Sequence, residues 1–172
     1  MKQKKTFAPA FRRRREQKTD YGRRLKQVTS EQPRLVVRKS NAHVRVQLVA
    51  YSPEGDRVLA SAFTREFHSA GWTANTSNTP AAYLAGKLAA RRARRAGIEQ
   101  AQLDIGFHTA VHKGVVFAAL KGALDGGLSI PHDPKVLPAD DRVNGQHLSE
   151  TARKALDRLR QQVEQGALDT GE

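Results

Sequence analysis

Arginine and lysine side chains are concentrated in the first quarter of the chain, and aromatic side chains lie between them. Residues 1–45 hold 15 basic and 3 acidic residues, residues 46–100 hold 7 and 4, and residues 101–172 hold 8 and 10. An arginine can donate two hydrogen bonds to one phosphate and can stack on a nucleobase, and rings such as Phe11 and Tyr21 can stack as well. The pattern therefore predicts a polyanionic partner and favours structured RNA.

The rest of the composition excludes several classes of protein. The chain has 172 residues, a formal net charge of +13 and no cysteine. Disulfide scaffolds, thiolate zinc sites, thiol nucleophiles and cysteine-ligated iron–sulfur clusters are therefore excluded. No stretch stays apolar for the roughly 18 residues that a membrane helix needs, so we expect no membrane partner.

The six histidines and the scattered carboxylates offer little support for catalysis. His108 and His112 are four residues apart, but their motif HTAVH lacks the internal glutamate that zinc proteases use as a general base. Both rings are expected to fill a loop or to touch RNA phosphates. Asp104 on a strand and Asp56 in a turn do not make the carboxylate cluster of a metal nuclease. With no nucleophile elbow and no phosphate-binding glycine loop, we predict no enzyme, no metal, no cofactor and no small-molecule substrate.

Hydrophobic alternation and turn residues predict a mixed sheet with helices packed on it. Charge repulsion should keep residues 1–28 extended until a partner neutralises them. Three strands joined by short turns should form an antiparallel meander, and a fourth strand, after the first long helix, should lie parallel to a neighbour. The expected elements are strands at 34–39, 43–50 and 57–63, a helix that Thr79 caps and Gly97 ends, a strand at 103–106 and a helix at 114–124. This β-β-β-α-β-α order indicates an α/β fold with ribonuclease-H-like topology.

The chain continues beyond this core in a proline-containing segment and a final helix. Residues 128–147 hold three prolines and little periodicity, so we expect an ordered extension. The last helix should be amphipathic, beginning after a Ser149 cap and ending at Gly166. We therefore expect one globular domain made of a basic RNA-binding arm at 1–30, a mixed α/β core at 31–128, and the extension with its C-terminal helix at 129–172.

Four segments resemble a known family, and they occur in the family's order. They are RLVVRKSNAHVRVQLV, GWTANTSNTPAAYLAG, VFAALKGALDGGLSIPH and VLPADDRVNGQHL. They are similar to the archaeal and eukaryotic form of a universal family of large-subunit ribosomal proteins, the 5S rRNA-binding family numbered eighteen in the bacterial scheme. The resemblance implies a structural, non-enzymatic protein of the central protuberance in the cytoplasmic ribosome. Its partners would be 5S rRNA, the large-subunit rRNA and neighbouring ribosomal proteins.

The resemblance also implies where RNA contacts lie. The basic arm would follow 5S and large-subunit rRNA, the end of the first strand would meet the 5S backbone, and the loop before the long helix would lie close by. A basic face on that helix, which also includes Lys87, should point outward. Trp72 could either stack on a base or close the core, and the segment TANTS departs from the family's usual glycine- and lysine-rich loop. The expected rRNA-binding residues are Arg12, Arg13, Arg14, Arg15, Lys18, Tyr21, Arg23, Arg24, Lys26, Arg38, Lys39, Ser40, Asn41, His43, Trp72, Asn75, Asn78, Arg91, Arg94 and Arg95.

Three other interpretations make different predictions. A general RNA-binding or chaperone protein outside the ribosome would show no preference for 5S rRNA. A metal nuclease of the same gross fold would cleave RNA with magnesium. An organelle-imported homologue would lose part of its first thirty residues on maturation.

Overall fold

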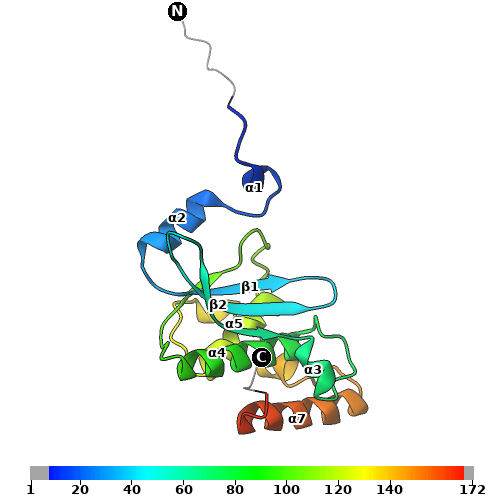
Figure 1. Ribbon diagram of the computed structural model, residues 1–172. Coiled ribbons are helices and arrows are strands. Elements are labelled where there is room, and N and C mark those ends of the chain that lie inside the picture. Colours follow the sequence, from blue (N-terminus) through cyan, green and yellow to red (C-terminus); the bar gives the residue numbers. More distant parts are fainter. Residues whose placement is uncertain (1–7, 169–172) are drawn as a thin grey trace, which may run out of the picture.

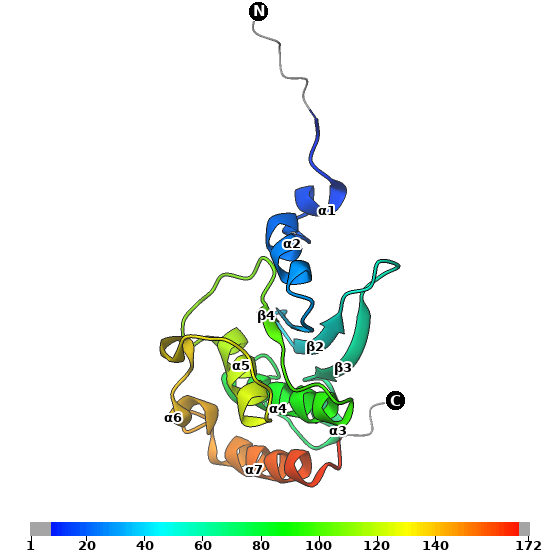
Figure 2. The same cartoon turned by 90° about the vertical axis from the view of Figure 1, so that its left-hand side faces the viewer.

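A sheet with helices on one of its faces makes up the folded part of the chain, and a basic arm lies over the other face (Figures 1 and 2). The computed structural model describes residues 8–168 (Figure 1). The strands are β1 (Arg34–Lys39), β2 (Val44–Ala50), β3 (Arg57–Phe63) and β4 (Gln102–Asp104). The helices are α1 (Arg12–Arg15), α2 (Tyr21–Thr29), α3 (Glu66–Ser69), α4 (Thr79–Arg95), α5 (Val115–Asp125), η1 (Pro134–Val136), α6 (Asp140–Val143) and α7 (Glu150–Gln165). Helices α4, α5 and α7 lie beneath the sheet, and α1 and α2 lie above it in both views (Figures 1 and 2).

The four strands form one mixed sheet in the order β3-β2-β1-β4. β1, β2 and β3 are antiparallel neighbours, and β4 pairs with β1 in parallel. Alternation explains the layering, because the side chains of Leu35 and Val37 on β1 and of Val46 and Leu48 on β2 all point into the core and are fully buried. The predicted α/β class, the antiparallel meander and the parallel fourth strand are therefore confirmed.

Two strand boundaries differ from the prediction by one or two residues. β2 begins at Val44 rather than at residue 43, and β4 covers 102–104 rather than 103–106. The side chain of Asp104 accepts a hydrogen bond from the backbone N–H of Gly106 at 2.8 Å, and Gly106 has a φ of 59°. This turn ends β4, because neither feature fits an extended strand.

Helices α4 and α5 approach each other closely along a row of small residues. A Cβ atom added at Gly86 of α4 would lie 1.9 Å from the carbonyl oxygen of Ala119, and one added at Gly122 of α5 would lie 1.9 Å from that of Tyr83. The predicted small-residue face of α4 thus packs on α5 as well as on the sheet. The cap of α4 is Asn78 and not Thr79, because the Asn78 side chain accepts from the Ala81 N–H at 2.9 Å.

The extension after α5 contributes to the same hydrophobic core. Leu156, Leu159 and Val163 of α7 are buried in one cluster with the inner face of the sheet, and Val143 of α6 joins them. α7 runs from the predicted Ser149 cap to Gly166, whose φ of 79° ends the helix. The extension is therefore ordered, as predicted.

The arm contains helices, which the charge argument did not anticipate. The expectation that residues 1–28 stay extended is wrong for α1 and α2. Asp20 caps α2 by accepting hydrogen bonds from the N–H groups of Gly22 at 3.0 Å and Arg23 at 3.2 Å. Residues 1–7, the first part of the predicted arm, lie outside the described residues. Among residues 8–168, no helix is both long and apolar enough to cross a membrane.

Candidate nucleic-acid interface

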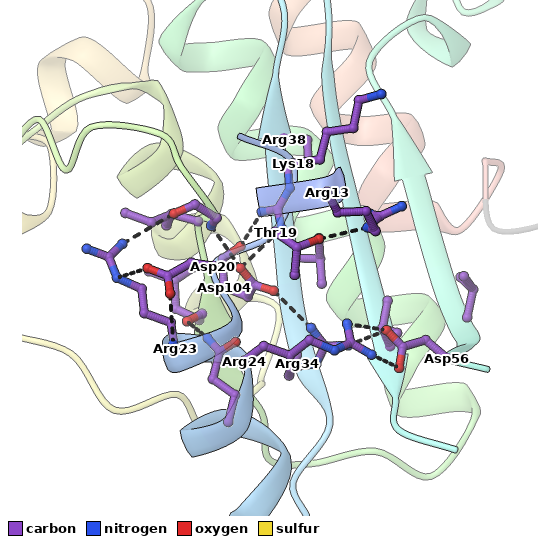
Figure 3. Close-up of a pocket in the computed structure, with 17 residues that line it drawn as sticks. Arg13, Lys18, Thr19, Asp20, Arg23, Arg24, Arg34, Arg38, Asp56 and Asp104 are labelled. Atoms are coloured by element: carbon purple, nitrogen blue, oxygen red, sulfur yellow. Dashed lines mark hydrogen bonds and ion pairs between the residues drawn. The ribbon is translucent and has the colours of Figure 1, made fainter. Parts of the chain in front are cut away.

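A chain of alternating arginines and aspartates joins the arm to the open face of the sheet (Figure 3). Arg24 of α2 donates from both terminal nitrogens to Asp56, at 2.9 and 2.8 Å. Arg34 of β1 donates to Asp56 at 2.6 Å and to Asp104 of β4 at 3.0 Å. Arg38 donates to the Asp104 carboxylate at 3.1 Å and to its carbonyl at 2.8 Å. We call these five residues the charge chain.

The charge chain is buried at its centre and half-buried at its two ends, Arg24 and Arg38. Arg34 is only 4% exposed and Asp104 only 8%, so each needs the other's charge. Burial alone would raise the pKa of the Asp56 carboxyl, but hydrogen bonds and positive charge from Arg24 and Arg34 outweigh burial and lower that pKa. The hydrogen bond to Asp56 raises the pKa of Arg24. Arg24 and Asp56 are therefore both ionised at neutral pH.

Acid should weaken this link first at Asp56. Its pKa is lowered in the folded state, so its contribution to stability is present above 3.8, the ordinary value, and is lost as the pH falls through the folded-state pKa. We expect the urea midpoint of the native chain to exceed that of Asp56→Asn by a constant amount near neutral pH. The difference should shrink below pH 3.8. A difference that does not change between pH 7 and pH 2.5 would contradict this assignment.

A hollow of about 400 Å³ lies between the arm and the sheet, beside the charge chain. Arg13, Lys18 and Arg23 of the arm line it together with Arg34 and Arg38. Some of these cations are held in place: Arg13 donates to the Thr19 hydroxyl at 2.9 Å, and Arg23 donates to the Gly106 carbonyl at 3.3 Å. Such a basic concave surface attracts phosphate and can follow an RNA backbone.

The outer part of the arm presents more cations and two aromatic rings. The side chains of Arg12–Arg15 are exposed. The rings of Phe11 and Tyr21 meet edge to face at 5.6 Å, and Phe11 is 76% exposed. Exposed rings beside cations can stack on unpaired bases.

The structure brings together two other groups of predicted residues, the end of β1 and the loop before α4. The Ser77 hydroxyl donates to the Ser40 carbonyl at 3.0 Å, and the Nδ1 atom of His43 lies 2.8 Å from the Thr76 hydroxyl. Lys39, Ser40 and Asn41 remain exposed at this junction. The two segments therefore form one polar surface.

Trp72 does not belong to that surface. Its side chain is 1% exposed and lies in the hydrophobic core, with the indole N–H donating to the Asn75 carbonyl at 3.4 Å. Stacking of Trp72 on RNA is therefore ruled out in this conformation, and the alternative, that it closes the core, is correct. Asn75 is exposed, and its side chain accepts from the Ser77 N–H at 2.7 Å. Asn78 is occupied as the cap of α4.

Part of the basic face of α4 is covered by the C-terminal helix. Lys87 forms an ion pair with Glu164 of α7 at 2.7 Å, and Arg91 donates to the Glu164 carbonyl. The expectation that these two side chains point outward is wrong, because Glu164 near the C-terminal end of α7 binds both of them. Arg94 and Arg95, one turn further on, are exposed.

Comparison with known proteins connects this geometry to a family. A family model described as "Ribosomal large subunit proteins 60S L5, and 50S L18" matches residues 5–98 and 94–133. The chain belongs to this L5/L18 family. Curated relatives named "Large ribosomal subunit protein uL18" agree. The protein of Methanoregula boonei is 51% identical over 151 residues, which are 88% of this chain and 87% of the relative. That of Methanobrevibacter smithii is 48% identical over 157 residues, 91% and 81% of the two chains, and that of Korarchaeum cryptofilum is 48% identical over 144 residues, 84% and 74%.

Membership of the L5/L18 family confirms the predicted resemblance to the archaeal type. The chain is a structural protein of the large ribosomal subunit in the cytoplasm, with ribosomal RNA and ribosomal proteins as partners, and it is not an enzyme. Within residues 8–168 no three histidine, aspartate or glutamate side chains are grouped as a metal site. His108 instead accepts a hydrogen bond from the Lys39 N–H at 3.1 Å, and burial, with the charges of Arg38 and Lys39, lowers its pKa.

The sequence argument missed several residues that organise the interface of this L5/L18 family member. Of the charge chain, Arg24 and Arg38 were among the predicted site residues. Arg34, Asp56 and Asp104 were not, because no local pattern links these distant positions. Arg45 was also missed, and its guanidinium lies 4.8 Å from the centre of the Phe63 ring. The only available signal was that Arg34, Arg38 and Arg45 occupy alternate positions on predicted strands, which placed three cations on one face of the sheet.

Proposed function

We propose that the chain binds 5S rRNA and helps to attach it to the large-subunit rRNA in the central protuberance. The observation that carries this proposal is the arm: exposed cations and two exposed rings project from a folded core beside a basic hollow. Phosphate contacts would supply most of the affinity, and stacking and shape would supply the preference for one RNA. Membership of a ribosomal protein family supports ribosomal RNA as the class of partner.

The parts of the chain would divide this work. The arm at 1–30 would contact RNA, the core at 31–128 would fix the arm and the polar surface at the end of β1, and the segment 129–172 would complete the core and face neighbouring ribosomal proteins. The rRNA contacts would come from exposed side chains among the predicted residues. These are Arg12, Arg13, Arg14, Arg15, Lys18, Tyr21, Arg23, Lys26, Lys39, Ser40, Asn41, Asn75, Arg94 and Arg95. Arg38, His43, Asn78 and Arg91 would support that surface from within.

A competition experiment tests the proposal. The protein is titrated with 5S rRNA and with an unrelated structured RNA of equal length, at several salt concentrations and with magnesium present. We expect a clear preference for 5S rRNA, no cleavage of either RNA, and a slope of log affinity against log salt of about −4 to −5 if roughly six phosphates are contacted. Equal affinity for the two RNAs would favour a general RNA-binding protein, and cleavage would favour a nuclease.

A further inference from the structure

Helix α2 is attached to the folded core almost entirely by polar contacts. None of its nine residues is buried, and Leu25 is 68% exposed. Apolar packing therefore does little to fix its orientation. Its side-chain hydrogen bonds to the described core are two from Arg24 to Asp56, one from Arg23 to the Gly106 carbonyl at 3.3 Å, and one from the Gln27 side chain to the Leu103 carbonyl at 3.2 Å.

We propose that Arg24 and Asp56 form a positioning pair, which holds α2 against the sheet so that the exposed cations of the arm meet RNA in one orientation. This inference rests on the proposed function, because it assigns a role within RNA binding by the arm. Under this inference Arg24 does not make the RNA contact that the sequence had predicted, but acts by positioning the neighbouring cations of the arm.

The geometry of Arg24 supports a positioning role. Both terminal nitrogens of its guanidinium are engaged by the two oxygens of one carboxylate, at 2.8 and 2.9 Å. This is the fork-to-fork arrangement by which arginine also grips phosphate. A phosphate could use the same donors only after Asp56 had been displaced, whereas Lys26, two residues further along α2, is exposed and forms no ion pair in the described part of the chain.

Asp56 is firmly held from the other side. Arg34 donates to it at 2.6 Å, and the Arg34 side chain is 5% exposed. Arg34 is in turn bound to Asp104, which also accepts from Arg38 and from the Gly106 N–H. The carboxylate that binds Arg24 is therefore fixed to two strands of the sheet. Its fixed position in turn sets the orientation of α2 relative to the sheet.

Loss of this pair should reduce affinity by reducing the docked fraction of α2. When only a fraction of molecules has the binding-competent arrangement, the apparent dissociation constant rises by the inverse of that fraction. If removal of the pair leaves α2 docked about a tenth of the time, 5S rRNA affinity falls about tenfold. The number of phosphates contacted in the complex stays the same, so the slope of log affinity against log salt should not change.

The test compares Arg24→Gln, Asp56→Asn, the double variant and the conservative Arg24→Lys, each titrated with 5S rRNA over a range of salt concentrations. Both single variants should bind about tenfold more weakly with an unchanged salt slope, and the double variant should bind no more weakly than either, because the two side chains act as one unit. Arg24→Lys should retain part of the affinity. Lys26→Gln is the matched control and should reduce the magnitude of the slope by about 0.7–0.9, as expected when one phosphate contact is lost.

Asp56→Asn is the decisive variant. It removes a negative charge, which by itself favours RNA binding, so weaker binding cannot be a charge effect. Stronger binding by Asp56→Asn, with a smaller slope for Arg24→Gln, would make Arg24 a phosphate contact and overturn the proposal. Unchanged affinity in both variants, with only a lower melting temperature, would reduce the pair to a structural role and also overturn it. Equal binding of 5S and control RNA by the native chain would instead contradict the proposed function and leave the pair's effect on affinity measurable.

Discussion

Replacing Gly122 by alanine is expected to lower the free energy of unfolding by about 3 kcal/mol, the upper part of the range for an overfilled core. The added Cβ atom would lie 1.9 Å from the Tyr83 carbonyl oxygen and 2.9 Å from the backbone nitrogen of Lys87. Both neighbours belong to the backbone of α4, so no side-chain rotation can relieve the clash, and the two helices must separate. For a chain of this size the melting temperature should fall by about 6–12 °C, measured by circular dichroism.

Two further variants make this prediction specific to the helix contact. Gly86→Ala places its Cβ atom 1.9 Å from the Ala119 carbonyl and should be similarly destabilising. Gly22→Ala, in α2, meets only the Asp20 carboxylate at 3.4 Å and should have little effect or a slightly stabilising one, since alanine favours helices over glycine. If Gly122→Ala and Gly22→Ala melted at the same temperature, the close approach of α4 and α5 would not exist in solution.

Removing residues 1–28 is expected to weaken binding to 5S rRNA by about a hundredfold at 0.1 M salt and to reduce the salt slope, because several phosphate contacts are lost together. The core should still unfold in one cooperative transition. The part of α2 that is removed has no buried residue, and Asp56 would keep its partner Arg34. Filter binding and thermal melting of the truncated protein measure the two effects separately.

A charge-matched control distinguishes the arm from positive charge in general. Arg153, Lys154 and Arg158 lie exposed on α7. Changing all three to glutamine removes as much charge as changing Arg12, Arg14 and Arg15 to glutamine. The α1 triple variant should lose far more affinity than the α7 variant. Equal losses would mean that net charge alone drives binding, and a broad or absent melting transition after truncation would mean that the arm is part of the folding unit.

The local pattern was enough to predict most of the sheet, because the burial of β1 and β2 follows the alternation of their apolar residues. Leu35 and Val37 on β1, and Val44, Val46 and Leu48 on β2, are apolar at every second position and fully buried. The fourth strand could be placed parallel to a neighbour because a helix precedes it. Its end could not be located, since that depends on a side-chain turn at Asp104.

The interface was harder to predict because its decisive contacts are distant in sequence. Arg34 and Asp104 are 70 positions apart in the sequence, and Arg24 and Asp56 are 32 apart. Counting charges along the chain therefore predicted repulsion within the arm and could not predict the contacts that attach the arm to the sheet. The helical spacing of Lys87 and Arg91 predicted an outward basic face, because the sequence does not show that α7 packs against these two side chains. The burial of Trp72 likewise depends on the loop that follows it and on the core beneath, and composition alone left both of its roles open.

The covering of α4 by α7 has a consequence for the order in which the protein matures during synthesis. Arg92 of α4 donates to the Ser61 carbonyl and to Glu66, and it also donates to the Leu168 carbonyl just beyond α7. Leu159 and Val163 of α7 are fully buried in the hydrophobic core. The core therefore cannot close until these late residues have left the exit tunnel, while the cationic arm emerges well before them. A nascent chain of this protein presents its cationic arm to the cell before it has a stable core to hold that arm.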